Sequence, residues 1–291
     1  MSIETKKEET VTICGNYRNA TGPIRVRMTN DYLFKALLQK NERVLRGLIC
    51  SLLHLKPDEL RSTEIQNPFI LGDSVGEKDI ILDIKVVIND NAILDLEMQV
   101  VNEHNWVPRS LYYVCSNYKN LKSGEDYNEA MPSVHIGFLD FTLFEEHPAL
   151  YSTYRMLEIK EHYEYTDKLQ IGVLDLTKID LATEEDKAYN IHEWAELFKA
   201  QTWEDIKMLA AKNQEIDDAA TTIYQLTEDE RVRQQCEARE DYLRRQKGMQ
   251  NLLDRQKQLL DKKDDIIAEQ KQEIEVLQKE IAKLKKNISG T

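Results

Sequence analysis

The period of the apolar residues changes along the chain and predicts helices, then strands, then helices again. Asn30 is a good N-cap for a helix with apolar residues at three- and four-residue spacing, and a second such helix ends before Pro57. Over 79–88 and 92–101 every second residue is apolar, as in strands that bury one face. The later elements are expected in this order: a helix over 107–123 ended by Gly124, strands over 133–141, 152–165 and 168–176, helices over 184–226, and one long helix from 228 nearly to the end.

This order of elements predicts an α+β fold followed by an all-α extension. Four parts are expected: an N-terminal tail over 1–28, a mixed domain over 29–180, a helical extension over 181–227 and a long helix over 228–291. At 291 residues the chain is long enough for one sizeable core and an appended segment.

The two alternating runs meet at residues 89–91 and predict a β-hairpin. With a three-residue loop, Asp83 lies opposite Glu97 and Lys85 opposite Asp95, and the apolar faces allow only register shifts that keep this parity. Directly opposed carboxylates repel each other, so the pair calls for a compensating cation, such as a hard divalent ion with oxygen ligands. The alternative is a hairpin with one solvated charged face, on which Lys85 neutralises Glu97 diagonally.

A heptad repeat of apolar residues marks the C-terminal helix. With Leu253 as position a, the later a residues are Leu260, Ile267, Ile274, Ile281 and Ile288, and the d residues are Gln256, Lys263, Gln270, Leu277 and Leu284. Isoleucine at a with leucine or glutamine at d favours a parallel dimeric coiled coil, so a homo-oligomer is expected. The alternatives are a single solvated helix, or packing of its first half on the helices of 184–226.

Composition and charge narrow the classes of function. Four scattered cysteines without a C-x-x-C pair and six dispersed histidines argue against a disulfide framework and a zinc site. No apolar run approaches the roughly 20 residues of a membrane span, and the N-terminus has no apolar signal segment, so a cytoplasmic protein with no membrane partner is expected. The net charge of −13 argues against coating DNA non-specifically and leaves contact with DNA to a local basic patch and bound cations.

Five short stretches resemble, in order and spacing, the PD-(D/E)XK nuclease superfamily and, more narrowly, its Rpn-type family of recombination-promoting nucleases and transposases. They are Asn30–Lys35 (NDYLFK), Lys78–Asp83 (KDIILD), Leu96–Gln99 (LEMQ), Arg109–Tyr113 (RSLYY) and Gly124–Tyr127 (GEDY). The resemblance covers roughly residues 29–145. It implies a restriction-endonuclease-like αβ core with a mixed sheet, DNA as the partner and Mg²⁺ as the cofactor.

The resemblance also implies a two-carboxylate metal site in the hairpin. Asp83 and Glu97 would hold Mg²⁺, with the backbone carbonyl of Met98 as a further ligand. Gln99 stands where the superfamily usually has lysine; it can orient a water or a phosphate oxygen but can neither act as a base nor carry charge. Lys85, on the same strand face as Asp83, is expected to provide the missing positive charge.

Three residues outside the hairpin have a functional and a structural interpretation. Asp31 is either an accessory carboxylate near the metal or a residue at a helix N-terminus paired with Lys35 one turn later. Arg109 and Tyr113 lie on one side of their helix, where they contact phosphate or, in the case of the tyrosine, pack half-buried.

The sequence therefore predicts a Mg²⁺-dependent DNA endonuclease of the recombination-promoting type, whose dimer would address both DNA strands. One alternative is a catalytically silent nuclease fold that serves as a DNA-binding or assembly module, in line with Gln99 and the acidic net charge. Another is a protein whose coiled coil is the main functional element and mounts the domain on a partner protein.

Overall fold

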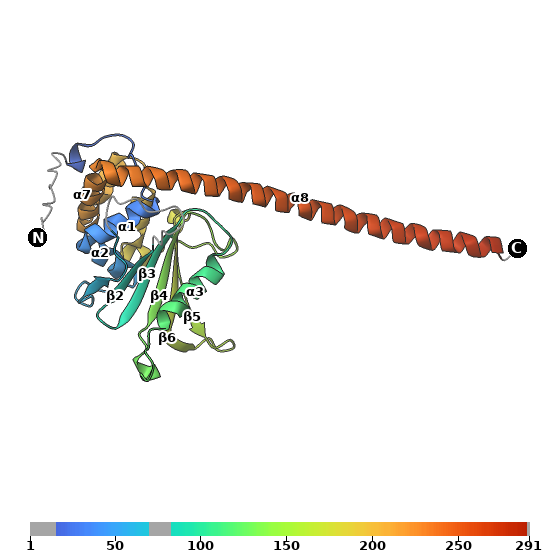
Figure 1. The fold of residues 1–291 in the computed structure, drawn as a ribbon, viewed down its shortest axis with the longest axis horizontal. Coiled ribbons are helices and arrows are strands. Elements are labelled where there is room, and N and C mark those ends of the chain that lie inside the picture. The colour runs from blue at the N-terminus through green and yellow to red at the C-terminus, as the bar shows by residue number, and fades with distance from the viewer. Residues whose placement is uncertain (1–15, 70–82, 290–291) are drawn as a thin grey trace, which may run out of the picture. The chain divides into compact units, whose positions relative to one another are not determined.

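A mixed six-stranded sheet organises the first of two units of the chain. The computed structural model describes residues 16–69 and 83–289, and the units are Met1–Leu243 and Arg244–Thr291. The strands are β1 (Thr63–Ile65), β2 (Ile84–Ile88), β3 (Ala92–Gln99), β4 (Ser133–Leu139), β5 (Tyr151–Leu157) and β6 (Glu164–Asp175), in the sheet order β1-β2-β3-β4-β6-β5. The β3–β4 and β4–β6 pairs are parallel, and the other neighbours are antiparallel. Helix α3 (Trp106–Tyr118) connects β3 to β4 and packs on β3, β4 and β6 (Figure 1).

The predicted hairpin and its register are confirmed. Ile88 pairs with Ala92 and Lys85 pairs with Asp95. β2 begins at Ile84, so Asp83 directly precedes the strand, and residues 79–82 of the predicted strand lie outside the described residues. The alternation of apolar and polar residues was sufficient to set this register because a shift by one residue would expose every apolar side chain.

The even-numbered residues of β2, β3 and β4 face a layer of helices. They are Ile84, Val86, Ile88, Leu94, Leu96, Met98, Val134, Ile136 and Phe138, and all except the β-strand ends are almost fully buried. They share one core with α1 (Asp31–Lys40), α2 (Glu42–Leu52), α5 (Ile191–Lys199) and α7 (Gln214–Glu228). The rings of Phe34, Phe138 and Phe198 contact one another at centroid distances of 4.9, 5.4 and 5.5 Å. The α+β fold class with a mixed sheet is thereby confirmed.

The segments predicted to be a tail and a helical extension contribute to this same core. Tyr17, Val26 and Met28 are buried within residues 16–28, and Trp194 and Ile223 are buried within 181–227. Two short helices, α4 (Glu184–Ala188) and α6 (Trp203–Ala210), and the 3₁₀ turns Tyr17–Asn19, Tyr127–Glu129 and Ile179–Leu181 complete the unit. Isolated apolar residues in an irregular segment have no period, so the sequence carries no signal of their burial.

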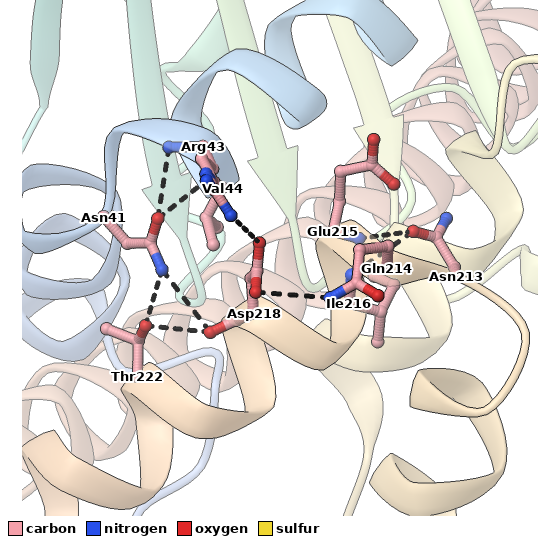
Figure 2. A network of polar contacts seen from close by, with 9 residues as sticks. All are labelled: Asn41, Arg43, Val44, Asn213, Gln214, Glu215, Ile216, Asp218 and Thr222. Atoms are coloured by element: carbon pink, nitrogen blue, oxygen red, sulfur yellow. Dashed lines mark hydrogen bonds and ion pairs between the residues drawn. The ribbon is translucent and has the colours of Figure 1, made fainter.

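Polar side chains link the start of α2 to the middle of α7 (Figure 2). Asn41 caps α2 with its side-chain oxygen and donates from Nδ2 to Thr222 Oγ1 of α7 at 2.8 Å. Asn213 caps α7, and an ion pair of 3.9 Å links Arg43 to Asp218 across the junction. The cap of α2 therefore also ties this helix to the side of α7, within the helical layer beside the sheet.

The predicted end of the central helix is wrong. α3 ends at Tyr118 and not at residue 123, and Gly124 lies in the following loop with a φ of 95°. The Asn120 side chain donates to the carbonyls of Asn117 and Met131 and accepts from the N–H of Met131. These bonds draw the chain toward the start of β4 and compete with a further helical turn.

The predicted position of the last strand turn is also wrong. The turn between β5 and β6 occupies residues 158–163 and not 166–167. Glu158 Oε2 accepts from the N–H groups of Lys160 and Glu161, and His162 adopts a φ of 58°. This turn contains neither glycine nor proline, so the usual sequence signal of a turn is missing.

Helix α8 (Glu230–Ser289) begins in the first unit and makes up the described part of the second. In the first unit its residues Val232 and Cys236 are buried. In the second unit the heptad a residues are half-exposed, at 47–59 %: Leu253, Leu260, Ile267, Ile274 and Ile281. Within the described ranges, no helix combines the length and the apolarity needed to cross a membrane.

Candidate active site

The odd-numbered residues of β3 and β4 lie on the sheet face that α3 covers. The β3 residues Asp95, Glu97 and Gln99 pair with His135, Gly137 and Leu139 of β4. Asp95, Glu97 and His135 are only 1, 7 and 0 % exposed, so their polar atoms are out of reach of bulk water. Buried polar groups need partners, and the neighbouring side chains provide most of them.

Asp83 and Asp95 form a pair of neighbouring carboxyl groups, of which Asp95 is fully buried and Asp83 is partly buried. Burial, followed by the charge of Asp95, raises the pKa of Asp83 to about 7. Burial also raises the pKa of Asp95 to about 6, against the opposing effects of the Asp83 hydrogen bond and of Lys85. Burial and the neighbouring carboxyl group therefore both favour the protonated form of Asp83.

Lys35 and Asn67 hold the backbone at Asp83. Lys35, on α1, donates from Nζ to the Asp83 carbonyl at 2.9 Å, and Asn67 donates from Nδ2 to the same oxygen at 3.1 Å. The Asn67 Oδ1 atom also accepts from the N–H of Lys85 at 2.9 Å. Burial lowers the pKa of Lys35, whereas Asp83 and Asp95 raise it, so the Lys35 amine lies in the field of both carboxyls.

Glu97 lies between a guanidinium and an imidazole. Arg109 Nη2 is 2.7 Å from Glu97 Oε1, and His135 Nε2 is 3.7 Å from Glu97 Oε2. Burial raises the pKa of Glu97, and the charge of Arg109 opposes this shift. Burial lowers the pKa of His135 to about 4, so the ring is neutral at neutral pH.

Two aromatic rings of α3 enclose His135. Trp106 stacks on the imidazole at 5.2 Å and 29°, and Tyr113 stacks on it at 5.6 Å and 9°. Gly137 makes room for Trp106, because a Cβ atom at this position would lie 2.1 Å from two atoms of the indole. His135 Nδ1 lies 3.1 Å from Asp95 Oδ2, so the ring connects the carboxyl pair to Glu97.

Four buried side-chain oxygens in this cluster have no hydrogen-bond partner among the described residues. They are Asp83 Oδ1, Asp95 Oδ1, Glu97 Oε2 and Gln99 Oε1. Mg²⁺ prefers oxygen ligands, so the residues present fit a hard divalent cation. In the same part of the chain, no group of three or more Asp, Glu, His or Cys side chains is already arranged to hold a metal. The cluster therefore offers suitable donors but not a complete set of side-chain ligands.

Comparison with known families identifies the group of proteins to which this fold and this cluster belong. A family model described as PD-(D/E)XK nuclease family transposase matches residues 28–256. The chain belongs to this family. The matched region contains the whole carboxyl cluster and all six strands. Searches of the curated proteins and of the solved structures gave no significant match.

In this PD-(D/E)XK family member, the three charged residues that were predicted as site residues of the hairpin lie around Asp95. Asp83 contacts Asp95, Lys85 is paired opposite it, and Glu97 follows two residues later on the same strand. Gln99 donates from Nε2 to the Val101 carbonyl at 3.2 Å. The Met98 side chain is buried in the core on the other face, so only the backbone of Met98 is available to the cluster.

Of the three predicted accessory residues, two reach the cluster and one does not contact it. Arg109 binds Glu97, and Tyr113 stacks on His135 while the Arg109 guanidinium lies 5.3 Å from the Tyr113 ring centre. Asp31, expected near the metal or paired with Lys35, gives both carboxylate oxygens to Arg239 of α8 at 2.6–2.9 Å. This ion pair joins residues 208 positions apart, which no local pattern can reveal.

Sequence reasoning gave Asp95 and His135 no part in the site and considered Lys35 only as an ion-pair partner of Asp31. Asp95 shares the two-residue period of the charged hairpin face, but its proposed partner was Lys85 and not Asp83. The signal for His135 is that Ser133, His135 and Gly137 alternate with the apolar residues of β4. This signal points to the site only if β4 is known to pair in parallel with β3, and the sequence alone does not predict that pairing.

Proposed function

We propose that this chain is a Mg²⁺-dependent DNA endonuclease of the recombination-promoting type, with Asp83 and Glu97 as its metal-binding carboxylates. The observation that carries the proposal is the pair of buried oxygens Asp83 Oδ1 and Glu97 Oε2, neither of which has a hydrogen-bond donor among the described residues. A buried carboxylate oxygen without a donor is costly unless a cation compensates for it. Membership in a nuclease family supports phosphodiester hydrolysis as the reaction.

The proposed metal ligands are those that the resemblance to the PD-(D/E)XK superfamily implies. Asp83 and Glu97 would hold Mg²⁺, and the backbone carbonyl of Met98 would be a further ligand. When bound, this ion lowers the pKa of a water ligand and neutralises charge on the scissile phosphate. Gln99 uses its Nε2 for Val101, so its Oε1 is left to accept a hydrogen bond from a water molecule.

Three cations lie next to the carboxylates, and in the proposal two of them, Lys85 and Arg109, meet the negative charge of DNA, whereas Lys35 is buried. Lys85 lies opposite Asp95 and, in the proposal, replaces the charge that the superfamily usually has at position 99. Lys35 fixes the Asp83 backbone from α1. The Arg109 side chain is 36 % exposed while it binds Glu97, so it is the cation best placed to reach a phosphate oxygen. Tyr113 acts through its stacking on His135.

Nicking of supercoiled plasmid DNA is expected with Mg²⁺ and is expected to stop when the metal is removed with excess EDTA. The reason is that the Asp83–Asp95 pair and Glu97 bring negative charge to the place where the phosphate must bind, and only a divalent cation reverses the sign of that field. Gel electrophoresis of the nicked and linear forms measures the reaction, and re-addition of Mg²⁺ in excess over EDTA should restore it.

The opposite outcome would favour a second function. If the purified chain nicks no plasmid with Mg²⁺ or Mn²⁺, the catalytically silent nuclease fold becomes the better description. Two features are consistent with that alternative: Gln99 cannot act as a base, and Arg109 already neutralises Glu97. Retained DNA binding in a mobility-shift assay would then define the chain as a binding or assembly module.

We further propose that the part of α8 in the second unit of the chain forms a parallel dimer with the same part of a second copy. Its a residues and Leu277 at d are half-exposed on the single helix. In the upstream half, where the d residues are polar, Leu252, Leu259 and Ile266 at position g are also 52–60 % exposed and widen the apolar stripe. An isolated helix does not keep so regular an apolar stripe in water, whereas a partner helix would bury it.

Ile274→Asp is expected to raise the dimer dissociation constant at least about 100-fold. Each dimer would lose two buried isoleucines at about 1.5 kcal/mol each, and each 1.4 kcal/mol is tenfold in affinity. Sedimentation equilibrium over a range of concentrations measures the effect. Gln272→Asp, at the outward-facing f position of the preceding heptad, is the matched control and should leave the constant unchanged. Equal effects of the two variants, or a monomeric wild-type chain, would contradict the dimer.

A further inference from the structure

The strand register places His135 between two acidic side chains of the proposed metal site. Parallel pairing sets His135 directly opposite Asp95 and sets Gly137 opposite Glu97. Because side chains two residues apart on neighbouring strands share a face, the imidazole lies beside both carboxyl groups. None of the interactions that place it there is local in sequence, since Asp95 and His135 are 40 residues apart.

The imidazole ring has little freedom to turn. It is fully buried and has Trp106 stacked on it at 5.2 Å and Tyr113 stacked on it at 5.6 Å. The absence of a side chain at Gly137 is what allows the indole to approach, because a Cβ atom there would meet two ring atoms at 2.1 Å. With both aromatic neighbours in place, the plane of the ring is fixed.

Each nitrogen lies near a carboxylate oxygen, Nδ1 within hydrogen-bond distance and Nε2 beyond it. Nδ1 lies 3.1 Å from Asp95 Oδ2, and Nε2 lies 3.7 Å from Glu97 Oε2. The other oxygen of Glu97 is bound by Arg109 at 2.7 Å, so one protein group faces each oxygen of this carboxylate. A phenylalanine would fill the same stacked space without burying two polar nitrogens, so the nitrogens, and not the packing, require an explanation.

We propose that His135 is a positioning residue that holds the Glu97 carboxylate, together with Arg109, in the orientation needed to bind the divalent cation. The inference rests on the proposed function, because it concerns the same metal site. His135 is not assigned as a metal ligand or as a base; it acts through Glu97. Groups that orient a metal ligand in this way typically contribute 10- to 100-fold to metal affinity.

The test measures Mn²⁺ affinity by calorimetry or by electron paramagnetic resonance, with thermal unfolding in EDTA recorded for each variant. His135→Phe keeps an aromatic ring between Trp106 and Tyr113 and should raise the Mn²⁺ dissociation constant about 10- to 100-fold. His135→Gln places an amide near the position of Nε2 and should stay within about threefold of wild type. His135→Asn places its amide near Nδ1, toward Asp95, and should behave like the phenylalanine variant. His147→Phe, in an exposed loop, is the matched control and should bind Mn²⁺ as wild type does.

The order of the variants separates positioning from packing. Unchanged affinity in His135→Phe, or better rescue by asparagine than by glutamine, would overturn the inference and leave the proposed metal site standing. Loss of cooperative unfolding in all three His135 variants would also overturn it, since the residue would then be needed for the fold itself. A wild-type chain that does not bind Mn²⁺ would overturn the metal site and, with it, this inference.

Discussion

Glu97→Gln is expected to reduce plasmid nicking at least about 100-fold, equivalent to about 2.7 kcal/mol of transition-state stabilisation. Glutamine has the shape of glutamate and still offers an oxygen to Arg109, but it cannot provide the negative charge that a divalent cation needs from its ligand. The fold should tolerate the change. Burial raises the pKa of Glu97, so the folded chain already disfavours the charged form at this position.

The measurement compares initial nicking rates at saturating Mg²⁺ with unfolding temperatures in EDTA. Asp83→Asn should show the same loss of activity, because Asp83 provides the other carboxylate of the proposed site. Glu129→Gln changes an exposed glutamate on the loop after α3 and is the matched control, with wild-type rates expected. Equal nicking by wild type, Glu97→Gln and Asp83→Asn would show that this carboxylate pair is not catalytic.

Arg239→Ala is expected to lower the free energy of unfolding by about 3–5 kcal/mol, the range for breaking a buried ion pair. Arg239 makes three contacts of 2.6–2.9 Å with both carboxylate oxygens of Asp31, which is buried at the first turn of α1. Burial raises the pKa of Asp31, and the hydrogen bond and charge of Arg239 are the largest effects that oppose this shift. Without the guanidinium, Asp31 must either take up a proton or remain as a buried, uncompensated charge.

Urea denaturation at neutral pH, followed by circular dichroism of the full chain, measures this loss. Arg231→Ala is the matched control on the same helix, because that side chain is 76 % exposed and lies 3.9 Å from Asp229; a change below about 0.5 kcal/mol is expected. The double variant Asp31→Leu/Arg239→Met removes both charges and should recover most of the lost stability. If the double variant is as unstable as Arg239→Ala, the cause is lost packing and not the uncompensated charge.

Helix α8, which has residues in both units of the chain, shows the limit of a heptad pattern. The repeat that begins at Leu253 correctly marks a helix with an exposed apolar stripe, and the same helix extends upstream to Glu230. Residues 230–243 nevertheless belong to the first unit, where Cys236 is buried and its carbonyl accepts from Asn30 at 2.9 Å. Where the helix leaves the globular unit depends on which surfaces it meets, and periodicity contains no information about those surfaces.

The sequence by itself determined the local parts of this protein. It determined the Asn30 cap, the two helices that follow it, and the register of the β2–β3 hairpin, because capping, helical period and strand alternation act between near neighbours. It also indicated the family of the chain, which is confirmed, and predicted Asp83 and Glu97 on one hairpin face. Only the tertiary structure decided that Asp83 meets Asp95, that His135 joins Asp95 to Glu97, and that Asp31 belongs to Arg239. These contacts depend on parallel strand pairing and on helix packing over long separations, and such contacts leave no period in the sequence from which to read them.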